Sequence, residues 1–171
     1  GFRMDVIPLL SKDLSFADKD WDELGGDHGR AYANGPRVHE FLREMNEQVL
    51  SRYEGVSIGE GIGVSKEEAN DYVGEGRDEL DMIFHFGHMF IDHGKEGRYD
   101  PRSFGREEFT GVFESWEAAL GDRGWGTIYL GNHDFPRLLS RFGDPEHHPE
   151  ASAKLLATLL MTLKGTPRSE E

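Results

Sequence analysis

The chain has 171 residues, 36% apolar and 30% charged, and 33 acidic against 19 basic side chains leave a formal net charge of −14. A chain this acidic repels phosphate backbones and anionic lipid. We therefore expect neither nucleic acid nor a membrane as a partner. No apolar run approaches the roughly 20 residues of a membrane span. The absence of cysteine excludes disulfides and thiolate metal sites and fits a reducing compartment, so we expect a cytoplasmic location.

Short apolar runs predict buried strands at four places along the chain. These runs cover residues 2–10, 56–58, 82–86 and 127–130. The segments between them carry apolar residues at helical spacing instead. The elements therefore alternate between strand and helix, which predicts an α/β fold with a parallel sheet and right-handed crossovers.

Three apolar stripes predict helices over residues 38–50, 109–120 and 155–163. Pro36 is expected in the first turn of the first helix, where a proline is tolerated. Ser65 and Glu68 have the spacing of a capping box, which predicts a shorter helix before Gly74.

The segments that follow the predicted strands are long, whereas most segments leading from helix to strand are short. The long ones run over about residues 11–35, 87–104 and 132–149. Barrel and doubly wound enzymes place their sites in such loops at the carboxyl ends of the strands. We therefore look for functional residues at those ends.

Three acidic residues lie at or just after the carboxyl ends of separate predicted strands: Asp5, Glu60 and Asp134. A single aspartate there is usually a turn former or a helix cap. Three acids at equivalent strand ends favour a shared site, because carboxylates are costly to bury unless they are paired.

Glycoside cleavage is a reaction that uses clustered carboxylates without a cysteine or a metal. It needs one ionised carboxylate and one protonated carboxylic acid beside the glycosidic bond. A third carboxylate stabilises the positive charge of the oxocarbenium-like transition state. The three acids are therefore candidate catalytic residues, and we expect no metal and no cofactor.

Five segments resemble the α-amylase superfamily, glycoside hydrolase family 13, in the family's own order. Residues 1–6 (Gly-Phe-Arg-Met-Asp-Val) resemble the motif of its fourth strand, and residues 56–60 (Val-Ser-Ile-Gly-Glu) that of its fifth. Residues 82–86 fit the sixth strand. Residues 131–137 (Gly-Asn-His-Asp-Phe-Pro-Arg) resemble the seventh-strand motif, and residues 155–167 the last helix before the eighth strand.

The resemblance implies an α-glucosidase of the oligo-1,6-glucosidase type, acting by a retaining double displacement on oligosaccharides. Asp5 would be the nucleophile and Glu60 the general acid and then base. Asp134 would bind hydroxyl groups of the sugar, with His133 beside it. Arg3 is expected to pair with Asp5 and keep it ionised, whereas Glu60 is expected to be less polar in its surroundings and less paired.

The same resemblance places Arg137 beside the first sugar site and makes Val6 a residue that tracks linkage preference. Valine after the nucleophile is similar to the members that act on α-1,6 bonds, so that linkage is favoured over α-1,4. Gly87 departs from the family, which often has a glutamate there, and this affects one expected sugar contact.

The family resemblance also implies a partial (β/α)8 TIM barrel of about four βα units, strands four to seven. Residues 1–171 would form the C-terminal half of the catalytic domain, starting in mid-protein, since no leader or initiator precedes the first strand. A full barrel needs about 250 residues. Exposed barrel edges predict that the chain either self-associates or is part of a larger polypeptide, and that hydrolysis by the chain alone is weak.

Three alternative hypotheses about the function of these residues remain open. His85, His88 and His93 with Asp92 have a spacing that a metal could use, although sugar-contacting or structural histidines fit better. Transglycosylating relatives such as trehalose synthases and sucrose isomerases share the same acids. A non-catalytic scaffold is a further alternative, which the retention of all three acids disfavours.

His147 and His148, beside prolines, are expected in an exposed loop.

Overall fold

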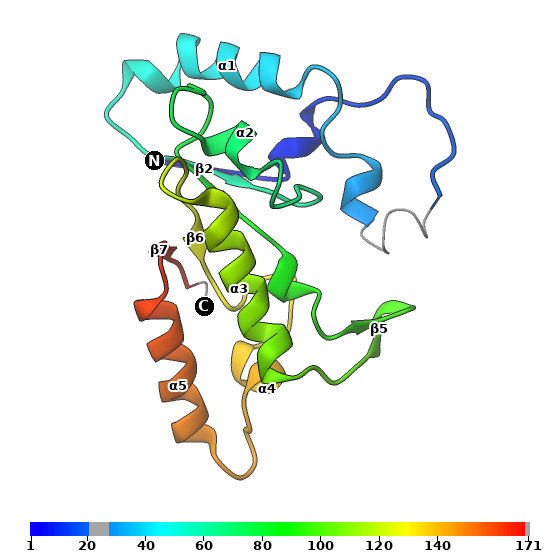
Figure 1. The fold of residues 1–171 in the computed structure, drawn as a ribbon, viewed down its shortest axis with the longest axis vertical. Coiled ribbons are helices and arrows are strands. Elements are labelled where there is room, and N and C mark those ends of the chain that lie inside the picture. Colours follow the sequence, from blue (N-terminus) through cyan, green and yellow to red (C-terminus); the bar gives the residue numbers. More distant parts are fainter. Residues whose placement is uncertain (21–27, 170–171) are drawn as a thin grey trace. The chain divides into compact units, whose positions relative to one another are not determined.

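A computed structural model describes residues 1–20 and 28–169. The chain divides into two compact units, Gly1–Trp125 and Gly126–Glu171. Figure 1 shows the path of the chain through its helices and strands. Each unit carries part of the predicted functional residues.

The first unit is built on a parallel sheet in the order β1-β2-β3. Its strands are β1 (Phe2–Met4), β2 (Ser57–Glu60) and β3 (Met82–Phe84). In register, Arg3 pairs with Ile58, which pairs in turn with Met82. The first three predicted strands and their parallel pairing are thus confirmed, and the carboxyl ends of all three meet at one edge of the sheet.

The first strand is shorter than predicted. Residues 2–10 do not form one strand, because Val6 adopts a left-handed backbone and a 3₁₀ helix, η1 (Ile7–Leu10), follows it. Pro8, in the first turn of η1, has no N–H to donate to a sheet. The chain therefore turns sharply just after Asp5.

The predicted helices of this unit are confirmed with shifted ends. They are α1 (Val38–Gln48), α2 (Ala69–Val73) and α3 (Arg106–Leu120). Pro36 lies just before α1 rather than in its first turn, because Arg37 is the N-cap. Ser65 and Glu68 exchange the expected side-chain and backbone hydrogen bonds at 2.8–3.3 Å, one turn ahead of α2.

The core of the first unit lies between the sheet and these helices. Its buried members come from η1, the three helices, the strands and the segments beside them: Ile7, Val38, Leu42, Val64, Ala69, Tyr72, Val73, Leu80, Ile83, Trp116 and Leu120. The apolar stripes of α1 and α3 therefore face inward, as their spacing predicts.

The segment after β3 contains structure that the sequence analysis did not predict. A 3₁₀ helix, η4 (Gly87–Met89), is followed by an antiparallel hairpin of β4 (His93–Gly94) and β5 (Gly97–Pro101). Two further 3₁₀ helices, η2 (His28–Ala31) and η3 (Leu50–Arg52), flank α1.

The second unit holds the fourth predicted strand. β6 (Thr127–Ile128) pairs in parallel with β7 (Thr166–Pro167), so that Thr127 lies opposite Thr166. Between them are a short unpredicted helix, α4 (Leu138–Phe142), and α5 (Pro149–Thr162), which starts six residues earlier than predicted because Pro149 opens its first turn. Gly165 tolerates a φ of 142° just before β7.

None of the helices in the described parts of the chain is apolar over a length that would cross a membrane. His147 is exposed, with 75% of its side chain accessible, and its Nδ1 lies 3.2 Å from Asp144 Oδ1. The prediction of an exposed loop at this histidine is therefore confirmed.

Candidate active site

The parallel sheet brings two of the three predicted catalytic acids to the same edge. Asp5 directly follows Met4, the last residue of β1, and Glu60 is the last residue of β2. Met4 lies opposite Gly59 in register, so Asp5 and Glu60 leave neighbouring strands at equivalent positions. This is the arrangement that the carboxyl ends of parallel strands provide for a shared site.

Arg3 bridges the two carboxyl groups. Its Nη1 donates to Asp5 Oδ1, and its Nη2 lies 3.1 Å from Glu60 Oε1. The expected pairing of Arg3 with Asp5 is present. The two acids differ in exposure, however, because 71% of the Asp5 side chain is accessible against 6% for Glu60. Arg3 therefore joins one exposed and one buried carboxyl group.

A backbone group completes the surroundings of Glu60. The Val6 N–H donates to Glu60 Oε2 at 2.9 Å. Val6 has φ 38° and ψ 42°, the left-handed region that a β-branched residue rarely adopts. Each oxygen of Glu60 thus has its own partner: the Arg3 guanidinium forms an ion pair with Oε1, and the Val6 amide donates to Oε2.

Burial is the largest influence on the pKa of Glu60, and it raises that pKa above the usual range of a glutamate. The Val6 N–H and the Arg3 charge oppose it, while a hydrogen bond and the negative charge from Asp5 add to it. The prediction that Glu60 would be less paired is wrong, because both of its oxygens have partners. Its raised pKa comes from desolvation, and it suits a carboxylic acid that holds a proton ready for transfer.

Glycines on both sides of Glu60 allow the core to close around it. A Cβ on Gly59 would lie 2.6 Å from Leu80 Cδ1, and one on Gly61 would lie 2.6 Å from Ile83 Cδ1 and 2.7 Å from the Phe84 carbonyl oxygen. A side chain at Gly61 would meet the backbone of β3, whereas one at Gly59 would require Leu80 and Ile7 to move. The glycines therefore explain how a carboxyl group is held so deep at a strand end.

The second unit presents the other three predicted site residues on one short segment. His133 Nε2 lies 3.6 Å from Asp134 Oδ2, with 62% and 52% of these side chains accessible. The Asp134 N–H donates to Asn132 Oδ1 at 3.0 Å, and Arg137 caps the start of α4. Their placement beside Asp5 and Glu60 remains a prediction.

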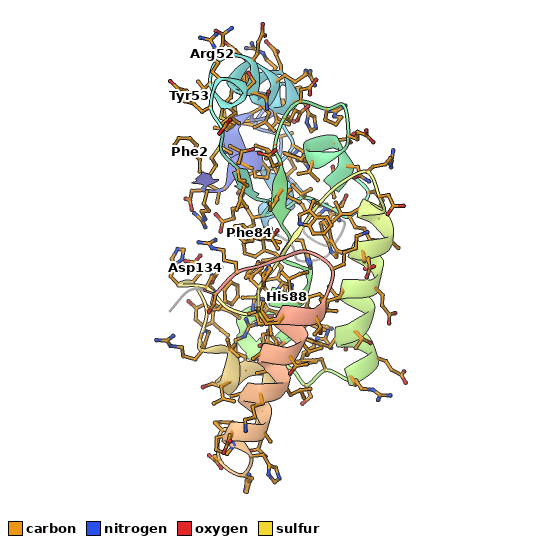
Figure 2. The ribbon with its side chains drawn as sticks, turned by 90° about the vertical axis from the view of Figure 1, so that its left-hand side faces the viewer. Phe2, Arg52, Tyr53, Phe84, His88 and Asp134 are labelled. Atoms are coloured by element: carbon orange, nitrogen blue, oxygen red, sulfur yellow. The ribbon has the colours of Figure 1, made fainter. Side chains whose placement is uncertain are left out.

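Two of the candidate metal ligands are buried histidines just beyond β3. The ring of His85 stacks on Trp116 with centroids 4.4 Å apart, and His88 meets His85 edge-on at 5.0 Å. Burial lowers the pKa of His85 to about 3. Figure 2 shows His88 on the chain that leaves Phe84 at the end of β3.

Over residues 1–20 and 28–169, no group of three His, Cys, Asp or Glu side chains has the geometry to hold a metal ion. His93 lies beside Asp92, with its Nε2 3.9 Å from Asp92 Oδ1. His85 and His88 both follow the end of β3, and both rings contact the ring of Phe113. They are packing residues of an aromatic cluster.

The amide of Val6 is the functional group that sequence analysis missed. It considered the side chain of Val6 as a marker of linkage, and nothing in the residue type signals a left-handed backbone. Valine disfavours that conformation, so only the packing of η1 against the sheet reveals it.

A parallel sheet with two arginine-bridged carboxyl groups at adjacent strand ends is typical of an α/β enzyme domain. Comparison with known families identifies the family of this domain. Residues 1–169 match the family described as "Alpha amylase, catalytic domain". The chain belongs to this family.

Curated relatives match nearly the whole chain. An oligo-1,6-glucosidase of Parageobacillus thermoglucosidasius is 43% identical over 98% of this chain, and one of Bacillus cereus is 44% identical over 98%. The chain spans only 30% of the length of each of these relatives. The activity of a whole relative is therefore not transferred directly.

Solved structures share the fold. An isomaltulose synthase variant from Erwinia rhapontici, in complex with sucrose, matches with a TM-score of 0.89 and 31% identity, over 96% of this chain and 30% of that one. The trehalose-6-phosphate hydrolase of Bacillus licheniformis, a variant in complex with a ligand, gives 0.87 and 37% over 97% and 29%. The chain therefore has the fold of a segment of these catalytic domains.

Proposed function

We propose that this chain carries the catalytic acids of a retaining glycoside hydrolase that cleaves α-glucosidic bonds in oligosaccharides. One observation supports this most directly: Asp5 and Glu60 end neighbouring parallel strands and share Arg3. One acid is exposed and salt-bridged, and the other is buried with a raised pKa. Two carboxyl groups with different environments are what double displacement requires.

In the first step, the Asp5 carboxylate attacks the anomeric carbon while Glu60 protonates the glycosidic oxygen, and the bond to the leaving sugar breaks. In the second, Glu60 takes a proton from water, which attacks the same carbon and releases Asp5. Arg3 favours the ionised form of Asp5, since an opposite charge stabilises a carboxylate. Asp134, His133 and Arg137 are proposed to hold the sugar.

The favoured linkage is α-1,6, with α-1,4 as the alternative. Valine at position 6 supports this choice, as do curated relatives called oligo-1,6-glucosidase. A relative from Pediococcus pentosaceus, 40% identical, is called α-glucosidase without a linkage. Hydrolysis of isomaltose faster than maltose is the expected preference.

Transglycosylation is the second candidate function. The similar structures include isomaltulose and trehalulose synthases at TM-scores of 0.89 and 0.88. The same acids serve both reactions, and the difference lies in whether water or a sugar hydroxyl reaches the glycosyl-enzyme. Product analysis with sucrose separates the two, because an isomerase returns a disaccharide and a hydrolase returns monosaccharides.

We further propose that residues 1–171 represent the C-terminal half of a TIM-barrel catalytic domain acting in the cytoplasm. The β1 edge of the sheet supports this, because Phe2 projects from it with 59% of its surface exposed (Figure 2). Such an edge favours pairing with further strands or with a second copy of the chain. Nucleic acid and membranes are not proposed as partners.

The test is turnover of p-nitrophenyl α-glucoside and isomaltose by the chain and by Asp5→Asn. The matched control is Asp78→Asn, at an exposed position whose φ of 55° asparagine tolerates. Activity lost in Asp5→Asn and kept in the control supports the proposal. Equal activity in all three chains contradicts the role of Asp5, and circular dichroism checks that each is folded.

A further inference from the structure

The backbone of Val6, which begins with the peptide group between Asp5 and Val6, has an unusual conformation for a valine. Val6 is β-branched and follows a strand, yet its φ of 38° and ψ of 42° lie in the left-handed region. Such a conformation persists in a non-glycine residue only when its surroundings fix it. Here the Leu9 N–H donates to the Val6 carbonyl oxygen at 2.9 Å, and the Val6 N–H donates to Glu60 Oε2 at 2.9 Å.

We propose that this peptide group is a positioning device for the acid/base: where the chain turns from β1 into η1, the Val6 N–H is held at Glu60 Oε2 and sets the orientation of that carboxyl group relative to Asp5. The inference rests on the proposed roles of Asp5 and Glu60. It assigns a function to the backbone of Val6 that is separate from any effect of its side chain on linkage.

The peptide plane explains how the two acids are coupled. A peptide group is rigid, so the carbonyl carbon of Asp5 and the N–H of Val6 move together. When that N–H holds Glu60 Oε2, the main chain of the nucleophile is tied to the carboxyl group of the acid. Their separation matters, because about 5–5.5 Å between the carboxyl groups is required for retention.

Arg3 and Val6 together fix the rotation of the Glu60 carboxyl group. Terminal carboxyl torsions are broad when nothing restrains them. Here Oε1 faces the Arg3 guanidinium at 3.1 Å, and Oε2 accepts the Val6 N–H. Among the residues that the structure describes in this unit, Arg3 and Asp5 are the charged groups that act on Glu60, and they shift its pKa in opposite directions.

The Val6 N–H also serves the second half of the reaction. A donor to a carboxylate favours the ionised form and lowers the pKa, which counteracts the burial of Glu60. Glu60 must give a proton and then take one, so a pKa held between the two extremes is useful. Without the N–H, only the charge of Arg3 would oppose burial, so the pKa of Glu60 would rise further and its action as base would be impeded.

The first experiment follows the Val6 amide by ¹H–¹⁵N NMR during a pH titration of the chain. We expect its proton resonance to move with the same midpoint as the Glu60 carboxyl carbon, observed by ¹³C labelling of glutamate. In Glu60→Gln both changes should disappear. A Val6 amide that does not respond when Glu60 titrates would overturn the proposal, and this measurement needs no enzymatic activity.

The second experiment removes the N–H alone by replacing Val6 with its α-hydroxy acid, which turns the amide into an ester. We expect the midpoint of Glu60 to rise by about one pH unit. The control places the same ester at Ile7, where the midpoint should stay unchanged. Val6→Gly keeps the N–H and loses the side chain, so an equal shift there would assign the effect to the side chain instead.

These outcomes separate the inference from the proposed function. If Glu60 shifts in the Val6 ester but Asp5→Asn leaves turnover intact, the positioning contact stands and the roles of the acids fall. If Asp5→Asn abolishes turnover while the ester leaves the Glu60 midpoint in place, the acids keep their roles and the backbone device is refuted.

Discussion

Two buried glutamates at opposite ends of the same sheet have very different surroundings. Glu79, just before β3, has a side chain with 0% exposure, contacted by His39 at 2.7 Å, Arg43 at 2.9 Å and Arg77 at 3.0 Å. Glu60, at the carboxyl end of β2, has a side chain that is 6% exposed, with one arginine as an ion-pair partner and one amide as a hydrogen-bond donor. The carboxyl group of Asp5 also acts on it and raises its pKa.

The difference shows how burial is used in each place. Around Glu79 the negative charge is neutralised by side chains from α1 and from the turn before β3, which fastens the helix to the sheet. Around Glu60 the charge is only partly compensated, and burial raises the pKa of its carboxyl group. Structural anchoring at the amino ends of strands and chemistry at their carboxyl ends is the usual division in barrel enzymes.

The largest expected effect tests the proposed role of Glu60 as general acid. Under the proposed function, Glu60→Gln should slow isomaltose hydrolysis roughly 10²–10⁴-fold, because general acid catalysis is lost. Release of p-nitrophenol from its α-glucoside in the first turnover should fall much less, since that leaving group departs without a proton. Glu67→Gln, with 71% of the Glu67 side chain exposed, is the control. Equal losses on both substrates would count against the assignment.

The next largest effect is expected from Glu79, the glutamate with the structural role. Glu79→Ala should lower the free energy of unfolding by about 3 kcal/mol, because it removes a fully buried carboxylate from three partners. Arg43 and Arg77 remain partly exposed and can be hydrated, which limits the loss. Urea denaturation followed by circular dichroism measures it.

Glu40→Ala serves as the control for that measurement. Glu40 pairs with Arg37 at 2.6 Å, but both side chains are more than half exposed, so removing it should leave stability nearly unchanged. If Glu79→Ala were as mild as Glu40→Ala, full burial and three partners would not distinguish an anchor from a surface ion pair.

His85 extends the comparison to a buried base whose pKa is lowered by burial. Burial lowers its pKa to about 3, below the unfolded value near 6.5, so its contribution to stability is complete above pH 6.5 and is lost as pH falls. Between pH 7 and pH 5 this costs the wild type about 2 kcal/mol.

The matched variant is His85→Phe, which retains an aromatic ring for the stack on Trp116. Its free energy of unfolding should fall less than that of the wild type between pH 7 and pH 5, measured in urea at both values. Parallel losses in the two chains would mean that His85 is not the group that takes up the proton.

The sequence predicted the parts of this architecture that depend on periodicity. The stripes of α1 and α3 and the first three strands are where the apolar patterns place them, since buried faces require apolar residues at those spacings. The strand-end positions of Asp5 and Glu60 follow from the same pattern. The family resemblance, now shown, supplied the candidate roles.

What escaped prediction depends on tertiary packing. The left-handed turn at Val6, which shortens β1, opposes the preference of valine and is fixed by contacts with Glu60 and η1. The bridging of both acids by Arg3 joins residues 57 positions apart, which no local signal reveals. The β4–β5 hairpin has short, mostly polar strands, and its periodicity is too weak to mark it.

The smallest expected effect decides which influence on Glu60 prevails. Its pKa is raised in the folded chain, so between the ordinary glutamate value and the raised one the folded chain binds more protons than the unfolded chain. The stability of the wild type should therefore fall as pH rises through that window, by an amount reduced by Arg3 and the Val6 N–H. Glu60→Gln cannot titrate, so its stability relative to the wild type should increase over the same window, as measured by urea denaturation in steps of pH. The opposite slope would mean that the two donors outweigh burial, and Glu60 would then resemble Glu79 as a compensated anchor rather than an acid held ready to give up its proton.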